Sequence, residues 1–260
     1  MPPESFSLTE ARQHPRQLGI RVKLDQPIHD LPEGEIGALS ALLAQHGVVC
    51  IVAQPPLQPR TLQEFAGRWG EVVELPPGLA FGNQEPGLPS IARVGNIRTD
   101  GSIIPGVNYA EYWHHDGNFW QPGQNFIVNF LSTVRIPSKG GQTGFFDSRS
   151  AYEALDDHHK TEFEGAFVRV RASEIGDFKK AAPAELPPEA THPVLLPHPL
   201  TKQIALYLPN SSTGIQKKDG TFLTTAKEVI GSSQTRSLSY EHSWTNGDLL
   251  IMDNLQVMHR

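Results

Sequence analysis

The sequence is poor in cysteine and lacks long apolar runs. Among its 260 residues Cys50 is the single cysteine, so no disulfide can form within the chain. Its neighbours at residues 48–52 are apolar, which predicts a buried thiol that packs as a small hydrophobe. No run approaches the roughly 20 apolar residues that a membrane-spanning helix needs, and residues 1–16 lack the apolar core of a secretory signal. We therefore expect a cytoplasmic protein with no membrane partner.

Blocks of basic charge are also missing. The chain carries 22 Lys and Arg against 28 Asp and Glu, a formal net charge of −6. The Lys and Arg residues are not clustered in any one stretch. This pattern argues against nucleic acid as a partner. The hydrophobic content of 38% is enough for a globular core. A small molecule is the expected ligand, and homo-oligomerisation is left open.

The order of apolar and polar residues predicts one mainly β domain with flanking helices. Residues 1–33 are polar and spotted with proline, and we expect them to form an N-terminal arm along the surface. Apolar residues at helical spacing predict a helix that ends at Gly47, and residues 48–53 predict a buried strand. Short strands separated by loops follow. A single domain over residues 34–260 is the simplest arrangement.

Further local signals place the remaining elements. Ser148 is the expected N-cap of a helix over residues 148–155. Asn246-Gly247 lies between two extended runs, which predicts a β-hairpin there. The long loop over residues 75–110 is expected to form a wall or lid of a site, with a solvated insertion as the alternative. Residues 173–190 are a second candidate mobile loop. We expect further strands at residues 90–94, 126–134, 143–146, 167–170, 194–196, 203–208, 239–243 and 249–252, and further helices at residues 62–70 and 224–230.

One segment offers metal ligands, Trp113-His114-His115-Asp116. If it is extended, His114 and Asp116 point to the same face, because they are two positions apart. His259, near the end of the chain, is a candidate third ligand. Two histidines and one carboxylate on one side of an ion form the facial triad of non-haem Fe(II) oxygenases. A His-x-Asp pair also arises by chance, so an ordinary core or surface histidine is the alternative.

Several segments in the same order resemble the taurine/2,4-D dioxygenase-like (TauD/TfdA) family of Fe(II)/2-oxoglutarate-dependent oxygenases. The resemblance covers residues from about 34 to the end. Its ordered set is more specific than any one motif, and consists of His46-Gly47-Val48-Val49, Trp113-His114-His115-Asp116, Lys139-Gly140-Gly141-Gln142-Thr143, His192-Pro193-Val194, and the stretch from Trp244 through Asp253-Asn254 to His259.

The resemblance implies a fold, a cofactor set and a reaction. The fold would be a double-stranded β-helix, a jelly-roll, cupin-like core. His114, Asp116 and His259 would bind Fe(II), and Thr143 would hydrogen-bond a carboxylate of the co-substrate 2-oxoglutarate. The enzyme would use O2 to oxidise a C–H bond of a small molecule, by hydroxylation or desaturation, and would release succinate and CO2.

The sequence also departs from the family pattern. Family members anchor 2-oxoglutarate with an arginine downstream of the last ligand, whereas this chain stops at Arg260, so we expect its C-terminal end to be incomplete. No histidine follows Gly70-Glu71, where taurine enzymes carry one, so taurine is not the expected substrate. Asp116 stands where related halogenases have a small residue, which disfavours halogenation.

Five residues near the metal motif are candidate substrate contacts, and simple packing is the alternative for each of them: Asn108, Tyr109, Tyr112, Phe119 and Trp120. In a strand His115 points away from His114, which predicts a structural role. Two other functions stay open on the sequence alone. One is a non-catalytic jelly-roll protein that binds a metal or small molecule, and the other is a hydrolase that uses a metal-bound water.

Overall fold

The computed structural model of the protein describes residues 4–74, 84–97, 102–103, 111–124, 127–175, 186–210, 213–232 and 238–260. Its largest sheet, here the major sheet, has five strands in the order β1-β2-β3-β15-β6. These strands are β1 (Phe6–Ser7), β2 (Ile20–Lys23), β3 (Val48–Val52), β15 (Leu249–Asp253) and β6 (Val128–Ser132). β15 runs antiparallel to both of its neighbours, so the last part of the chain lies inside the sheet.

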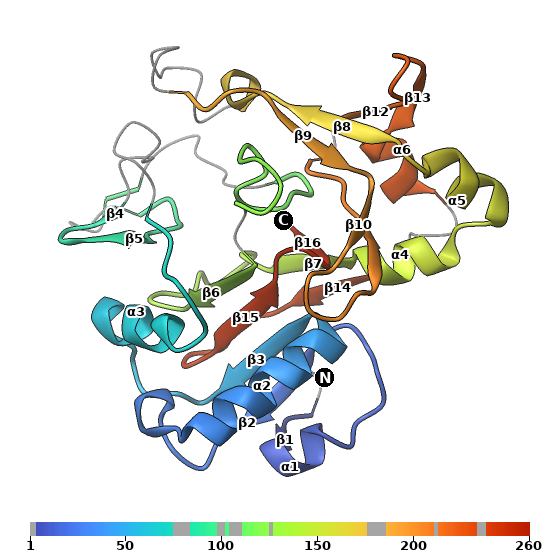
Figure 1. Ribbon diagram of the computed structural model, residues 1–260. Helices are drawn as coiled ribbons and strands as arrows, with labels where there is room; N and C mark the ends of the chain where they lie inside the picture. Colours follow the sequence, from blue (N-terminus) through green and yellow to red (C-terminus); the bar gives the residue numbers. More distant parts are fainter. Residues whose placement is uncertain are drawn as a thin grey trace.

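A second sheet, here the minor sheet, packs against the major sheet. It consists of β14 (Ser239–His242), β7 (Thr143–Asp147) and β16 (Val257–His259), in the order β14-β7-β16. Figure 1 shows β15, β7, β14 and β16 close together in the middle of the molecule, where the chain also ends. The two sheets therefore bring segments from the middle and the end of the sequence side by side.

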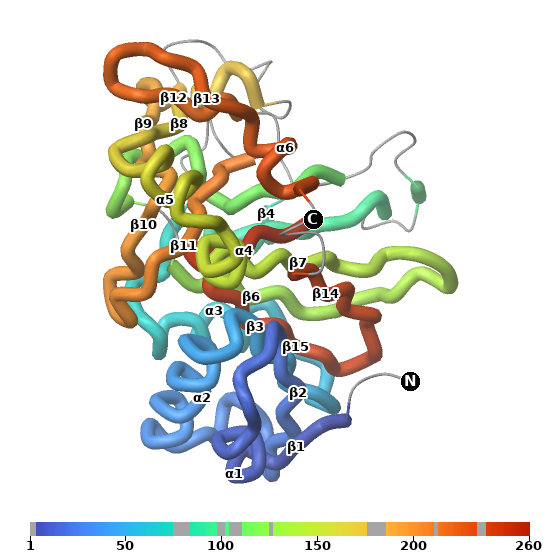
Figure 2. Tube along the Cα trace, turned by 90° about the vertical axis from the view of Figure 1, so that its right-hand side faces the viewer, coloured from blue at the N-terminus to red at the C-terminus, as the bar shows by residue number. Residues whose placement is uncertain are grey.

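Smaller sheets complete the β structure. β13 (Phe222–Thr225), β12 (Gly214–Gln216), β8 (Phe167–Val170) and β9 (Ala190–Pro193) form a four-stranded sheet in that order, and two pairs are formed by β10 (Leu195–Pro197) with β11 (Ile204–Leu206) and by β4 (Gln84–Glu85) with β5 (Leu88–Ala92). Figures 1 and 2 show β12 and β13 at the end of the molecule opposite β1 and β2.

Helices cover the outside of these sheets. They are α1 (Leu8–Ala11), α2 (Glu33–His46), α3 (Pro59–Gly67), α4 (Ser148–Ala154), α5 (Asp157–Phe163) and α6 (Ala226–Gly231), with short 3-10 turns η1 (Ile28–Asp30) and η3 (Ala172–Glu174). As the sequence predicts, α2 ends at Gly47, which has φ +70 and whose N–H donates to the Leu43 carbonyl. No helix among the described residues is both long and apolar enough to cross a membrane.

The central strand β3 is buried on both faces, because alternate side chains enter two different cores. Val49 and Ile51 pack into the core beneath α2 and α3. Val48 and Cys50 face the minor sheet and meet Phe145 there. The prediction of a mainly β, jelly-roll fold with flanking helices is confirmed, and so is the burial of Cys50.

Two local predictions are wrong. The N-terminal segment is not a surface arm throughout, since β2 pairs in parallel with β3 and Val22 is fully buried. The Asn246-Gly247 turn does not close a hairpin, because β14 pairs with β7 in the minor sheet whereas β15 pairs within the major sheet. Gly247 instead turns the chain from one sheet to the other, and its carbonyl accepts from the Gln54 amide.

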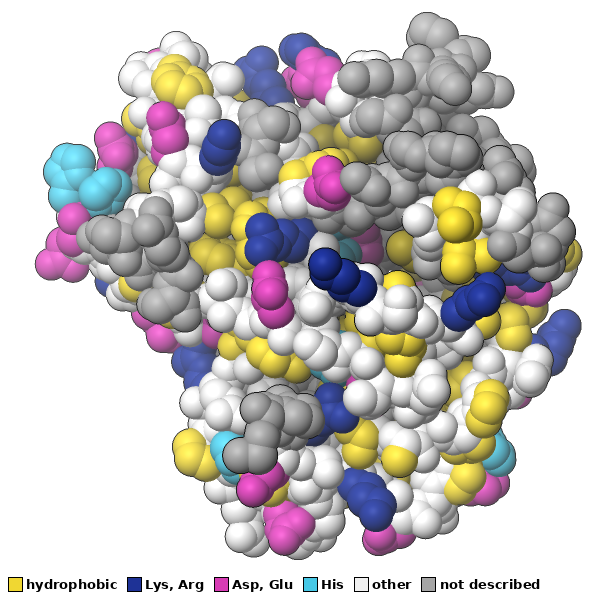
Figure 3. All heavy atoms as spheres, turned by 180° about the vertical axis from the view of Figure 1, so that it is seen from behind, with side chains coloured by type: hydrophobic (Ala, Val, Ile, Leu, Met, Phe, Trp, Pro, Cys, Tyr) yellow, Lys and Arg dark blue, Asp and Glu magenta, His cyan; other side chains and the backbone are white. Residues whose placement is uncertain are grey.

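Two other details also differ from the expectations. The helix over residues 148–154 is capped by Asp147, whose side chain accepts from the amides of Arg149 and Ser150, so Ser148 is not the N-cap. The helix expected from residue 224 begins at Ala226, because Thr225 forms a capping box with Glu228. On the face drawn in Figure 3, basic and acidic side chains of the described residues are interspersed rather than separated by sign.

Candidate metal centre

Backbone pairing brings the two predicted histidine ligands together. The amide of His114 donates to the His259 carbonyl at 3.0 Å, and the amide of His259 donates to the His114 carbonyl at 2.9 Å. This two-residue bridge places His114 beside the last residue of β16, at the edge of the minor sheet. The imidazole centroids consequently lie 4.3 Å apart.

Asp116 completes a three-residue group. Its Oδ1 lies 3.4 Å from Nε2 of His114, and its Oδ2 lies 3.5 Å from Nε2 of His259. The ligand atoms of all three residues lie within 4.8 Å of one another. The Asp116 side chain is 40% exposed while the imidazoles are 13% and 11% exposed. The two imidazoles are thus mostly buried, whereas part of the Asp116 carboxylate is exposed to solvent.

The tautomer of His114 suits metal binding. Its Nδ1 lies 3.0 Å from the Tyr112 carbonyl, and a carbonyl can only accept, so Nδ1 carries the proton. The lone pair of Nε2 is then directed toward Asp116. Metal-binding histidines commonly have their second nitrogen fixed in this way. Nδ1 of His259 is buried and has no hydrogen-bond partner among the described residues.

Two asparagines hold Asp116 in place. Nδ2 of Asn129 donates to Oδ2 of Asp116 at 2.6 Å. The side chain of Asn254 accepts from the Asp116 amide and donates to the Asp116 carbonyl, both at 2.9 Å. Asn129 was not identified from the sequence. The available signal was an amide side chain between the apolar residues Val128 and Phe130, because buried polar groups need partners.

The pKa values describe a site ready for a cation. Burial lowers the pKa of His259 to about 4, against the opposing effect of Asp116. Burial alone would raise the pKa of Asp116, but His259 and His114 hold it well below its usual range. For His114 burial is outweighed by Asp116, so its pKa is raised and a bound cation would compete with a proton there. Near neutral pH the set offers the carboxylate of Asp116 and the neutral imidazole of His259.

His115 takes the structural role that the sequence predicts. It is fully buried, its ring stacks on Tyr207 at 4.5 Å, and its Nδ1 lies 2.6 Å from the Asn254 carbonyl. Burial lowers the pKa of His115 to about 3. Because the Asn254 carbonyl accepts from His115, the His115 ring helps to hold Asn254 in the position where it binds the Asp116 backbone.

Thr143 stands at the start of β7, and its hydroxyl accepts from Nε1 of Trp244 at 3.0 Å. Its contact with 2-oxoglutarate stays a prediction. The guanidinium of Arg260 lies over the ring of Trp113 at 4.7 Å and donates to Glu241 at 3.0 Å. These contacts occupy Arg260 beside β7 and β14.

The predicted substrate contacts have different surroundings. Asn108 and Tyr109 lie outside the described residues. Phe119 is 6% exposed and belongs to a small core cluster, against which Trp120 packs. Tyr112 is 46% exposed and lines a pocket. Phe119 and Trp120 therefore pack in this cluster, and a substrate contact stays a prediction for them and for Tyr112.

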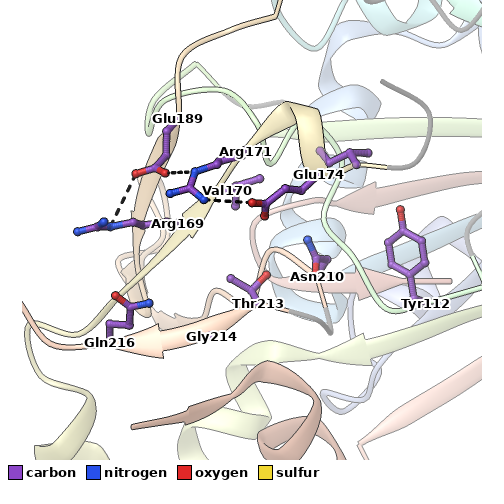
Figure 4. A pocket seen from close by; sticks show the side chains of 11 residues that line it. Tyr112, Arg169, Val170, Arg171, Glu174, Glu189, Asn210, Thr213, Gly214 and Gln216 are labelled. Atoms are coloured by element: carbon purple, nitrogen blue, oxygen red, sulfur yellow. Dashed lines mark hydrogen bonds and ion pairs between the residues drawn. The ribbon is translucent and has the colours of Figure 1, made fainter. Parts of the chain in front are cut away.

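The pocket beside Tyr112 has a volume of about 490 Å³. It borders the metal centre, because its lining residue Asn210 forms a backbone bridge with His114. Figure 4 shows ion pairs at one end of the pocket, Tyr112 at the other, and Thr213 and Asn210 between them. The lining residues are Tyr112, Arg169, Val170, Arg171, Glu174, Ile175, Glu189, Asn210, Thr213, Gly214 and Gln216.

The charges at the end of this pocket balance. Glu189 accepts from Nε of Arg171 at 2.6 Å, and its other oxygen lies 3.7 Å from Nε of Arg169. Glu174 accepts from Nη1 of Arg171 at 3.1 Å. Two cations thus face two anions. The lining is mostly polar, with hydroxyl and amide groups on the side that borders the metal centre.

A family model described as taurine catabolism dioxygenase TauD, TfdA family, matches residues 6–260. The α-ketoglutarate-dependent 2,4-dichlorophenoxyacetate dioxygenase of Cupriavidus pinatubonensis is 27% identical over 87% of this chain and 82% of its own length. Pentalenolactone F synthase of Streptomyces avermitilis is 29% identical over 84% of this chain and 76% of its own length.

The fold is similar to that of a solved structure. A crystal structure of AAD-2 in complex with Mn(II) and N-oxalylglycine superposes with a TM-score of 0.71 at 20% identity, covering 95% of this chain and 90% of that chain. The family model extends over nearly the whole sequence. This protein therefore belongs to the TauD/TfdA family of dioxygenases.

Proposed function

We propose that His114, Asp116 and His259 bind Fe(II) in an α-ketoglutarate-dependent dioxygenase that oxidises a C–H bond of a small molecule. The protein is an oxidoreductase of a family that works with Fe(II), 2-oxoglutarate and O2. One observation carries the assignment of the ligands: donors from distant parts of the sequence converge with both Nε2 atoms facing one carboxylate. The comparisons give no support to the non-catalytic alternative.

The donor set fits the metal. Two imidazoles and one carboxylate on one side of Fe(II) leave open positions for reactants. With 2-oxoglutarate and O2 present, such a centre supplies an oxidant strong enough to attack a C–H bond. For hydroxylation the balance is substrate plus O2 plus 2-oxoglutarate giving hydroxylated substrate, succinate and CO2. Desaturation, with water as a further product, stays the alternative outcome.

The protein's own groups bind, orient and shield the reactants. Tyr112 fixes the His114 tautomer through its carbonyl, and Asn254 fixes the backbone of Asp116. Thr143 is our proposed contact for a carboxylate of 2-oxoglutarate. The arginine that would anchor 2-oxoglutarate stays a prediction, as do a single domain over residues 34–260, a cytoplasmic location and the oligomeric state.

Thr213 is our proposed substrate contact in the pocket. Its hydroxyl is buried without a hydrogen-bond partner among the described residues, and the residue is only 8% exposed. An unpaired buried hydroxyl is costly unless a ligand satisfies it. Thr213→Val keeps the shape and removes the hydroxyl. With any substrate that supports succinate release, we expect KM to rise about five- to tenfold with iron binding unchanged; an unchanged KM would remove Thr213 from the site.

The assignment of the ligands is tested by turnover. Succinate should form from 2-oxoglutarate only with Fe(II) and O2, and His114→Ala should abolish it. A matched control is His158→Ala, which removes an exposed histidine of α5. Full turnover by the His114→Ala protein, with iron bound as in the unchanged protein, would refute the proposed ligand set.

A further inference from the structure

The strand β6 presents two different faces along its length. Val128 and Phe130 pack outward into the core under α3, where Phe130 meets Phe65 edge to face at 5.7 Å. Leu131 packs against the inner core between the major and minor sheets. Side chains alternate along a strand, so Asn129 points to the same inner side as Leu131. An amide therefore stands where the pattern would allow an apolar side chain.

The amide of Asn129 has one clear partner. Its Nδ2 donates to Oδ2 of Asp116 at 2.6 Å, a short distance for a hydrogen bond to an ionised oxygen. The neighbouring strand β15 holds the backbone of Asn129 in place, because Met252 is its register partner. The next residues after β15 deliver Asn254, which binds the Asp116 backbone. The carboxylate is thus fixed at its side chain by one asparagine and at its main chain by another.

This contact bears on how Asp116 can bind a cation. The carboxylate has two oxygens, and the N–H of Asn129 occupies one lone pair of Oδ2 and sets the rotation of the group. Nε2 of His114 lies 3.4 Å from Oδ1, and Nε2 of His259 lies 3.5 Å from Oδ2. A carboxylate held in this way keeps its oxygens turned toward both imidazole nitrogens, where one ion can contact all three groups. A carboxylate free to turn would lose this alignment, and the three groups would then bind an ion more weakly.

We propose that Asn129 is a positioning residue that holds the carboxylate of Asp116 in the orientation in which it can bind a metal ion together with His114 and His259. The inference rests on the proposed function, because it takes Asp116 as a ligand. Asn129 itself touches neither the metal nor the substrate in this account. It acts through the oxygen that it holds.

The experiment measures metal binding apart from turnover. Intact protein is titrated with Co(II) without O2, and the visible bands report both affinity and coordination. Asn129→Leu and Asn129→Ala remove the donor, and Leu131→Met is the control on the same strand and the same inner side. We expect the two donor-free variants to bind Co(II) about 10- to 100-fold more weakly, with altered bands, while Leu131→Met binds like the unchanged protein.

A longer amide separates hydrogen bonding from packing. Asn129→Gln can still donate, so it should bind Co(II) more tightly than Asn129→Leu, and the reverse order would contradict a donor role. Binding within twofold of the unchanged protein by either folded donor-free variant would overturn the inference while leaving the proposed function intact. If the unchanged protein and His114→Ala bind Co(II) equally, the proposed ligand set fails first.

Discussion

Two groups of three side chains in this protein have nearly the same chemistry and different surroundings. His114, Asp116 and His259 lie at the edge of the minor sheet, and Cys50, His242 and Asp248 lie between the two sheets. In each group the ligand atoms come within 4.8 Å of one another. We call them the open group and the closed group. The distances between the ligand atoms alone do not tell the two groups apart.

The difference lies in which atoms already have partners. In the closed group Nδ1 of His242 pairs with the Tyr240 hydroxyl at 2.9 Å, and Nε2 pairs with Asp248 at 3.1 Å. Asp248 also accepts from the Thr245 amide and faces Arg21 at 3.4 Å. Burial raises the pKa of the Cys50 thiol. No lone pair of His242 is left for a cation, and Arg21 supplies positive charge in its place.

The largest contrast is expected from removing one histidine of each group. His259→Ala should reduce Fe(II) or Co(II) binding and succinate formation by more than about a hundredfold, beyond the range expected for supporting hydrogen bonds. His242→Ala should leave one metal ion bound per folded chain. Metal content after gel filtration measures both. Loss of the metal from folded His242→Ala protein would mean that the closed group supports the centre.

A smaller effect is expected on stability. Asp248→Ala leaves Arg21, 11% exposed, and His242, fully buried, without their shared anion. Breaking a buried pair at one partner costs about 3 kcal/mol or more of the free energy of unfolding. Glu153→Ala is the control, because its ion pair with Arg16 is exposed and should contribute little. Urea unfolding measures both, and equal midpoints would show that the closed group is not structural.

The pH dependence of Asp248 follows from the same contacts. Burial would raise its pKa, but His242 and Thr245 lower it below the ordinary value. A lowered carboxyl pKa contributes stability at pH values above about 4 that is lost as the pH falls through the lowered pKa. Unfolding midpoints of the unchanged protein and Asp248→Asn should therefore converge as the pH falls from 6 toward 3. Parallel curves would exclude the linkage.

The smallest effect is expected at Cys50. A free thiol is half ionised near pH 8.5, and the thiolate form reacts quickly with disulfide reagents. Because burial raises its pKa, Cys50 should stay a neutral thiol, and native protein should react no faster at pH 9 than at pH 7. Reaction should appear only when the protein is unfolded. Fast labelling of native protein would show that the closed group opens.

The sequence was sufficient for the candidate ligands and for the elements with local signals. His114 and Asp116 are two residues apart in the sequence. The residues of β3 form an apolar run that predicts a buried strand. Pairing between distant strands was not readable, because the local pattern at residues 245–248 is the same whether the flanking strands pair or separate. The role of Asn129 could not be predicted for a similar reason, since its hydrogen-bond partner Asp116 lies in another segment of the chain. Packing of β2 into the major sheet overrode the polar composition of the N-terminal segment.

The central claim concerns the open group, and an anaerobic titration tests it most directly. Protein loaded with Fe(II) is titrated with 2-oxoglutarate, and the visible absorption is followed in the unchanged protein, His259→Ala and His242→Ala. We predict a weak charge-transfer band that saturates at one 2-oxoglutarate per chain in the unchanged protein and in His242→Ala, and no band in His259→Ala. The same saturating band in His259→Ala would contradict the assignment of the open group as the metal centre.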